Sequence, residues 1–159
     1  MRHVAHLAIR NRGAIGGSLS HADRAAELPM LSAFYDARIS IRGPNGSRTV
    51  AAEEFFIDAL TSCLEPNEIV VEVKFPILDH DGWAFEEVAR RFGDFALASI
   101  ALSVRRSGSK PRDARIAVMC VADTPLRLKE AERERVALTL DEQAPELTGS
   151  SAATARPAC

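Results

Sequence analysis

The chain has 159 residues, of which 47% are hydrophobic and 26% charged, so it can bury the core of one domain or of two small ones. Its net charge of −2 provides no basic surface for nucleic acid or for an acidic membrane. No run approaches the roughly 18 apolar residues of a membrane helix, and the N-terminus lacks the apolar core of a signal peptide. The three cysteines form no C-x-x-C pair, which favours a reducing compartment. We therefore expect a cytoplasmic protein that binds no nucleic acid and does not insert into a membrane.

In the first half of the chain, short helices are expected to alternate with strands. The expected elements are a helix over residues 25–34, strands over 37–42 and 47–51, a helix over 52–59 and a strand over 68–75. Asp23 is the predicted N-cap of the first helix. The sequence Gly43-Pro-Asn-Gly46 predicts a tight turn, which would join the first two strands as a hairpin.

The second half is expected to be an antiparallel sheet with one helix. Turn residues over 76–82 mark the boundary between the halves. Beyond it we expect strands over 84–91, 95–106 and 114–122 and a helix over 128–138. The Ala- and Leu-rich run within the second of these strands could also form a helix, but a hairpin turn follows it, which favours a strand. The predicted fold class is α+β.

The most informative segment is RNRGAIGGSLSHAD, which begins at Arg10. Gly13, Gly16 and Gly17 can adopt positive φ angles, and the amides of such a turn can converge on a phosphate. His21 adds a side-chain donor nearby. From these residues alone, an ordinary turn before a helix and a site for an unrelated nucleotide or phosphate both remain open.

The longer string RNRGAIGGSLSHADRAAELP resembles the second flavin-binding motif of the FAD-binding (medium) subunit of molybdenum hydroxylases, the xanthine dehydrogenase and carbon monoxide dehydrogenase family. Three later segments, residues 53–56, 64–71 and 82–96, also resemble this family in order and in approximate spacing. The resemblance implies FAD as the cofactor. It also implies an α+β fold in which part of an FAD-binding subdomain, with short helices and mixed or antiparallel strands, precedes a three-stranded antiparallel sheet with a helix.

The resemblance implies two groups of cofactor-binding positions. A loop lies against the FAD pyrophosphate, and it maps to Ala14, Ile15, Gly16, Gly17 and Ser18. Four further positions approach the cofactor, and they map to His21, Glu27, Val70 (or its neighbour Ile69) and Glu86. Many relatives have Thr or Ser where this chain has Ala14, so one side-chain hydrogen bond to phosphate is absent. The resemblance implies neither a catalytic acid or base nor a metal ligand.

Three of these further positions also have interpretations that need no cofactor. Asp23 and Glu27 are both favourable at the positive end of the helix that follows them. Val70 belongs to a run that alternates as one face of a strand, and Glu86 can be a solvated charge.

By the same resemblance, the chain is an electron-transfer subunit of an oxidoreductase complex. A large subunit with a molybdenum cofactor would oxidise the substrate, a small iron–sulfur subunit would carry electrons to FAD, and the flavin would reduce an external acceptor. Residues 1–76 would then be the second half of the FAD-binding domain, 77–140 part of the C-terminal flavoprotein domain and 141–159 a disordered tail.

Relative to the family we expect the chain to be truncated at both ends and inactive alone. An alternative is therefore a structural or interaction remnant that no longer binds flavin. A sheet without the family's covering helices would expose one apolar face, and the side chains expected there are Ile100, Leu102, Ile116 and Val118.

Overall fold

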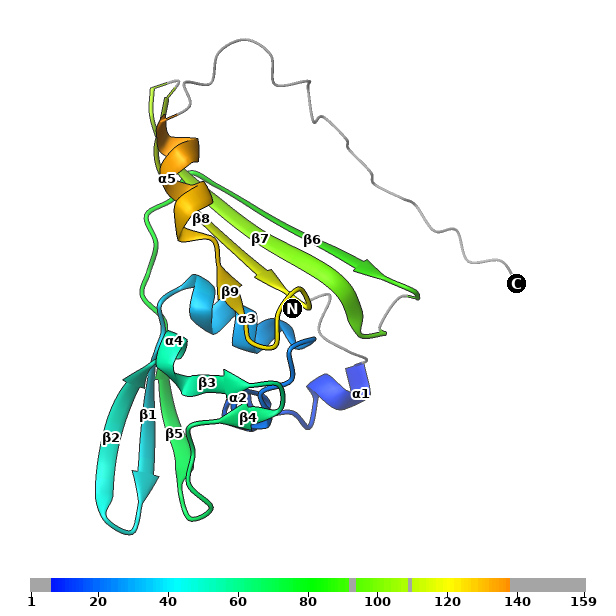
Figure 1. The fold of residues 1–159 in the computed structure, drawn as a ribbon, viewed down its shortest axis with the longest axis vertical. Helices are drawn as coiled ribbons and strands as arrows, with labels where there is room; N and C mark the ends of the chain where they lie inside the picture. The colour runs from blue at the N-terminus through cyan, green and yellow to red at the C-terminus, as the bar shows by residue number, and fades with distance from the viewer. Residues whose placement is uncertain (1–6, 92–93, 109, 138–159) are drawn as a thin grey trace.

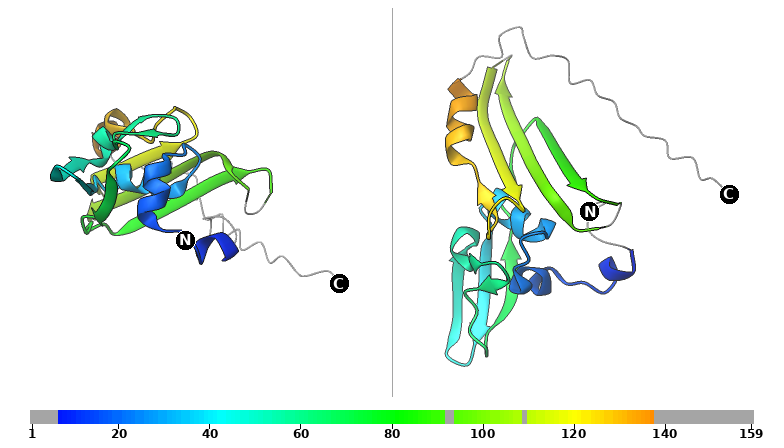
Figure 2. Two further views of the ribbon diagram at one scale, coloured as in Figure 1. Left: turned by 90° about the horizontal axis from the view of Figure 1, so that it is seen from below. Right: turned by 45° about the vertical axis from the view of Figure 1, so that its right-hand side comes forward.

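The computed structural model describes residues 7–91, 94–108 and 110–137. Figures 1 and 2 show a sheet in each half of the chain, with helices between and beside them. The first half contains α1 (Leu7–Arg10), α2 (Ile15–His21), α3 (Glu27–Phe34), β1 (Arg38–Gly43), β2 (Gly46–Ala51), α4 (Ala52–Phe55), β3 (Phe56–Asp58), β4 (Thr61–Ser62) and β5 (Ile69–Lys74). The second half contains β6 (Gly82–Ala89), β7 (Ala96–Ser107), β8 (Lys110–Met119), β9 (Leu126–Arg127) and α5 (Lys129–Ala137). The α+β fold class is confirmed.

The first half is organised around a three-stranded antiparallel sheet with the order β2-β1-β5. The predicted hairpin is present, and its turn places Gly46 at φ +119°, a conformation that only glycine adopts without strain. The predicted strand over 68–75 is β5, which pairs with the other side of β1.

Two predictions in this half are wrong. The helix expected over 52–59 ends after one turn, and its remainder becomes β3, which pairs with β4. The backbone N–H of Cys63 donates to the carbonyl of Phe55 at 2.8 Å, so this carbonyl is already bonded where the helix ends. Asp23 is not an N-cap, because α3 begins after Ala26 and Asp23 Oδ1 accepts from the N–H of Ala25 at 2.8 Å.

The first core lies between α2, α4 and the three-stranded sheet. Leu19, Ile39, Ile41 and Phe55 are each 0% exposed and belong to one apolar cluster. The rings of Phe55 and Phe56 meet edge to face with centroids 5.2 Å apart. This core holds α2 in place, and α2 carries the glycine segment.

The second half is a four-stranded antiparallel sheet with the order β6-β7-β8-β9. The strand expected over 95–106 is β7, and the helix expected over 128–138 is α5. The short strand β9 was not predicted, since its two residues are too few to show alternation.

The second core joins the two halves. Met30 and Phe34 of α3 share an apolar cluster with Ala101, Ala117 and Met119 of the four-stranded sheet. Small alanine side chains on the sheet let the helix approach its surface closely. In Figure 1, α3 accordingly lies between the two sheets.

The opposite face of the four-stranded sheet is only partly covered. Ile100 is 42% exposed, as expected for this face. The same expectation is wrong for Ile116, which is 7% exposed because α5 packs along β8, whereas Leu102 and Val118 are half-buried. In the right-hand view of Figure 2, α5 lies beside β8, away from β6.

Charged side chains also link the halves. Asp36, just after α3, accepts from Arg115 at 2.9 Å and from Arg127 at 2.6 Å. Arg127 in turn makes two hydrogen bonds to Glu132, at 2.7 and 2.8 Å. Glu132 Oε1 also accepts from the buried N–H of Ile116 at 2.9 Å. The network therefore ties α3, β8, β9 and α5 together.

Candidate functional site

The glycine segment folds differently from the expected turn. Gly16 and Gly17 lie in the first turn of α2, and neither they nor Gly13 adopt a positive φ angle. The loop expected here is therefore helical from Ile15 onward, and none of the three glycines uses the positive φ angle that it could adopt. A Cβ added to Gly16 would lie 3.5 Å from the Cβ of Val70, whereas one added to Gly17 would meet no atom within 4 Å. Gly16 thus lets helix and strand pack closely, and Gly17 leaves its outer surface open.

The N-terminal end of α2 has the properties of an anion-binding surface. Ala14 is its N-cap, and no side chain caps the helix there. The first amides of a helix have no acceptor within the helix, and the helix dipole makes this end partly positive. Ser18 donates its backbone N–H to the carbonyl of Ala14, while its side chain is half-buried. Residues 14–18 are thus brought together at one helix end, as the resemblance implies.

A broad hollow adjoins this helix end. It has a volume of about 800 Å³ and is lined by Ile9, Asn11, Arg12 and Gly13. Arg12 is exposed and lies two residues before Ala14 in the chain, so it brings a cation close in sequence to the uncapped amides. Reasoning from the sequence overlooked Arg12, although its position two residues before the family-like loop was a usable signal.

Three of the other expected site residues lie on α2 or close to it. Val70 packs against Gly16 and joins the first core. His21 is exposed at the opposite end of α2 from Ala14. Glu27 is half-buried in the first turn of α3.

Glu86 is not brought to this group. Its neighbour Phe85 belongs to the cluster that contacts α3. Side chains alternate along a strand, so the exposed Glu86 points to the opposite face of the sheet and Glu87 points toward α3. The sequence places two adjacent glutamates on a strand but cannot decide which of them faces inward.

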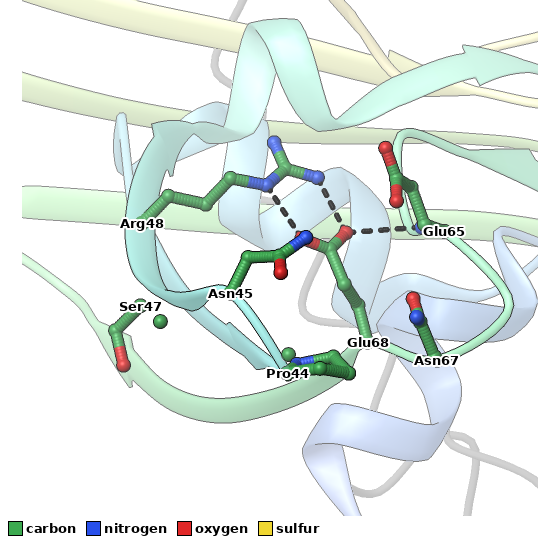
Figure 3. Close-up of a pocket in the computed structure, with 9 residues that line it drawn as sticks. Pro44, Asn45, Ser47, Arg48, Glu65, Asn67 and Glu68 are labelled. Atoms are coloured by element: carbon green, nitrogen blue, oxygen red, sulfur yellow. Dashed lines mark hydrogen bonds and ion pairs between the residues drawn. The ribbon is translucent and has the colours of Figure 1, made fainter.

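A second, smaller pocket that is partly open to solvent lies between the β1–β2 turn and residues 65–68 (Figure 3). Its volume is about 120 Å³, below the roughly 300–1,000 Å³ of typical small-molecule sites. Arg48 spans it with hydrogen bonds of 2.9 and 2.7 Å to Glu68 and one of 2.8 Å to the carbonyl of Cys63. The charges of Arg48 and Glu68 therefore satisfy each other, and we call this pair with the Cys63 carbonyl the Arg48 clamp.

The Arg48 clamp predicts a pH effect. The hydrogen bonds from Arg48, then the one from the N–H of Glu65, lower the pKa of Glu68 from its ordinary value of 4.5 to about 2. The stabilisation is therefore complete above about pH 4.5 and is lost as the pH falls toward 2. In urea titrations at several pH values, we expect wild type to exceed Glu68→Gln in midpoint at pH 6, with the difference vanishing near pH 2. A difference that stays constant across this range would contradict the Arg48 clamp.

Other chemistry is sparse in the described ranges 7–91, 94–108 and 110–137. They contain no group of three His, Cys, Asp or Glu side chains that could hold a metal ion. Burial raises the pKa of the Cys120 thiol above its ordinary value, so the thiolate is disfavoured. None of the helices in these ranges has the length and apolar character needed to span a membrane.

Comparisons with known proteins match both halves of the chain. Residues 1–78 match the family described as the FAD-binding domain in molybdopterin dehydrogenase. Residues 83–155 match the CO dehydrogenase flavoprotein C-terminal domain.

Individual relatives agree with these matches. The carbon monoxide dehydrogenase medium chain of Hydrogenophaga pseudoflava is 40% identical over 84% of this chain and 46% of its own length. The 6-hydroxypseudooxynicotine dehydrogenase complex subunit alpha of Paenarthrobacter nicotinovorans is 41% identical over 86% of this chain and 47% of its own. The crystal structure of quinoline 2-oxidoreductase from Pseudomonas putida 86 superposes with a TM-score of 0.83 at 39% identity, covering 88% of this chain and 49% of that one. This chain thus spans about half the length of its relatives. Sequence and fold together show that it belongs to the family of FAD-binding medium subunits of molybdenum hydroxylases.

Proposed function

We propose that this chain binds FAD, with the pyrophosphate against the N-terminal end of α2, and works as the flavin subunit of a molybdenum hydroxylase. The observation that carries the proposal is the uncapped start of α2 with open space above Gly17, within a segment that matches an FAD-binding domain. Its amides and the nearby Arg12 suit two negatively charged phosphates. The residues present therefore fit the phosphate part of the cofactor.

The chain's own contribution is binding and orientation. FAD, when bound, supplies the acceptance of electrons and their transfer to an external acceptor. Ala14, Ile15, Gly16, Gly17 and Ser18 would hold the phosphates through the backbone, and Val70 fixes the distance between helix and strand. Glu27 lies beyond the far end of α2, where it would approach the sugar or ring portion of the cofactor. No step assigned to this chain needs a catalytic acid or base.

Flavin binding is tested by titrating the purified 159-residue chain with FAD and following flavin fluorescence. We expect saturable binding, weakened about 10- to 100-fold by Gly17→Val, because the added side chain occupies the space above the amides and loss of a charge-assisted hydrogen bond costs ~1.5–3 kcal/mol. Gly82→Val is the matched control, since an added Cβ there also meets no atom within 4 Å. Equal affinity in wild type and Gly17→Val would place the phosphates elsewhere. Absence of binding would favour the alternative of an interaction remnant, and preference for another nucleotide would favour a different ligand.

We further propose that the chain assembles with a large molybdenum-cofactor subunit and a small iron–sulfur subunit in the cytoplasm. Relatives are described as a medium chain and as a subunit of a complex, which supports partners of this kind. The free thiols of Cys63 and Cys120 suit a reducing compartment. Co-expression with the two subunits of a related enzyme, followed by affinity purification of this chain, tests the assembly. Recovery of this chain alone would contradict it.

A further inference from the structure

The strand β6 forms an open edge of the four-stranded sheet. It pairs with β7 along its whole length, from Gly82 to Ala89, and no strand of the described ranges pairs with its other side. In Figure 1 and in the right-hand view of Figure 2, β6 accordingly lies at the outside of the sheet. Its outer N–H and carbonyl groups can therefore pair with a strand of another chain.

This edge lacks three of the devices that commonly keep an edge strand from pairing, which are lysine, proline and a bulge. Residues 82–89 contain neither lysine nor proline. The ladder has one irregularity, since Val88 is opposite Ala98 whereas Ala89 is opposite Ala96. The extra residue, Leu97, belongs to β7, so β6 keeps a regular alternation of side chains. The edge of β6 can therefore take up another strand in a regular ladder.

The side chains along this edge alternate in a charged and apolar order. Val88 is 62% exposed, and the exposed Glu86 lies two residues earlier on the same face. Arg90 follows directly after the end of β6 and is also exposed. Neither charged side chain forms an ion pair within the part of the chain that the structure describes. At every second position the edge thus presents a negative, an apolar and a positive side chain.

This order is complementary to itself when the strand is reversed. When a twofold axis perpendicular to the sheet relates two antiparallel copies of one strand, one residue lies opposite its own copy, and residues equally far before and after it face each other. With Val88 on the axis, Glu86 of each copy lies opposite Arg90 of the other. Directly opposite Cβ atoms are about 4.5–5.5 Å apart, so both charge pairs can form. An axis at Glu86 or Glu87 would instead place two glutamates opposite each other, which is unfavourable.

We propose that β6 is the interface of a symmetric dimer of this chain, in which two copies pair antiparallel about Val88 and their four-stranded sheets join into one continuous sheet. The occupant is a second copy because the strand itself supplies both members of each charge pair. The guanidinium of Arg90 donates to the Glu86 carboxylate of the other copy, and the two Val88 side chains meet at the axis. The new ladder also pairs the outer N–H and carbonyl groups of β6.

The test is sedimentation equilibrium of the full 159-residue chain over a series of concentrations. Because the interface is one strand edge, we expect a weak dimer with a dissociation constant of about 1–100 μM. Glu86→Arg and Arg90→Glu each place like charges opposite one another in both pairs, so each should raise this constant about 10-fold or more. Glu134→Arg makes the same charge change at an exposed position on α5, and it should dimerise like wild type.

Combining the two variants tests the register itself. The Glu86→Arg chain is positive at both positions and the Arg90→Glu chain is negative at both, so an equimolar mixture restores two pairs of opposite charge. We expect the mixture to dimerise about as tightly as wild type. The double variant Glu86→Arg/Arg90→Glu should do the same by itself, because its pairs are exchanged. Misfolded variants could not be rescued in this way, and far-ultraviolet circular dichroism of each chain checks the fold directly.

Three results would overturn the dimer. The first is a wild-type chain that stays monomeric up to about 200 μM, which would leave the edge of β6 to a strand of a different protein. The second is a dimer that Glu86→Arg does not weaken, or that Glu134→Arg weakens equally, since either would place the contact on another surface. The third is a mixture of the two single variants that stays monomeric. None of these measurements involves FAD, so the dimer and the proposed function stand or fall separately.

Discussion

Replacing Arg127 by Met is expected to lower the free energy of unfolding by about 3–5 kcal/mol, because it leaves the Glu132 carboxylate buried without its cation. The side chain of Glu132 is 8% exposed and that of Arg127 18%, so water cannot take over the lost contacts. The same change also removes the ion pair with Asp36 and so weakens the connection between α3 and β9. Because the free energy of unfolding of a small domain is about 5–15 kcal/mol, this loss is a large share of the total stability. Urea unfolding followed by circular dichroism measures it.

Two further variants separate burial from charge. Lys129→Met removes the exposed ion pair with Glu53 at 2.6 Å, and it should cost no more than about 1 kcal/mol. The double variant Arg127→Met/Glu132→Met removes both buried charges and should recover much of the stability lost in Arg127→Met. Equal losses of stability in Arg127→Met and Lys129→Met would show that the buried Arg127–Glu132 pair contributes no more than the exposed one.

Replacing Phe55 by Ala should cost about 3–5 kcal/mol, because it opens a cavity in the first core. Phe55 is 0% exposed and lies in the same cluster as Leu19 of α2, so the cavity would also loosen the helix that carries the glycine segment. We therefore expect weaker FAD binding in this variant, with the loss of stability measured independently in urea.

The matched control for this prediction is Ile57→Ala on β3. Ile57 is 61% exposed, so truncating it removes little buried area and should change stability by less than about 0.5 kcal/mol. A small effect of Phe55→Ala would mean that neighbouring side chains collapse into the cavity. In that case α2 would keep its position, and FAD affinity should stay close to that of wild type.

Local patterns predicted much of the secondary structure. The hairpin around Gly46 was predictable because its turn residues and flanking alternation both act over a few positions. The strand β7 was predictable for the same reason, despite its helix-forming residues. The strand β3, which follows Phe55, was not predictable in this way. Its pairing with β4 depends on contacts that a helix-forming pattern does not reveal.

The family, the α+β fold class and the position of the glycine segment follow from residue order and short-range spacing, so the sequence is enough to predict them. The different roles of the two glycines depend on which side of α2 meets β5: Gly16 packs against Val70, and Gly17 stays open. The packing of the folded chain also determines that Glu87, and not Glu86, faces α3. The two residues are chemically identical, and only the register of β6 against β7 and the packing of Phe85 on the second core distinguish the inward face of the strand from the outward one.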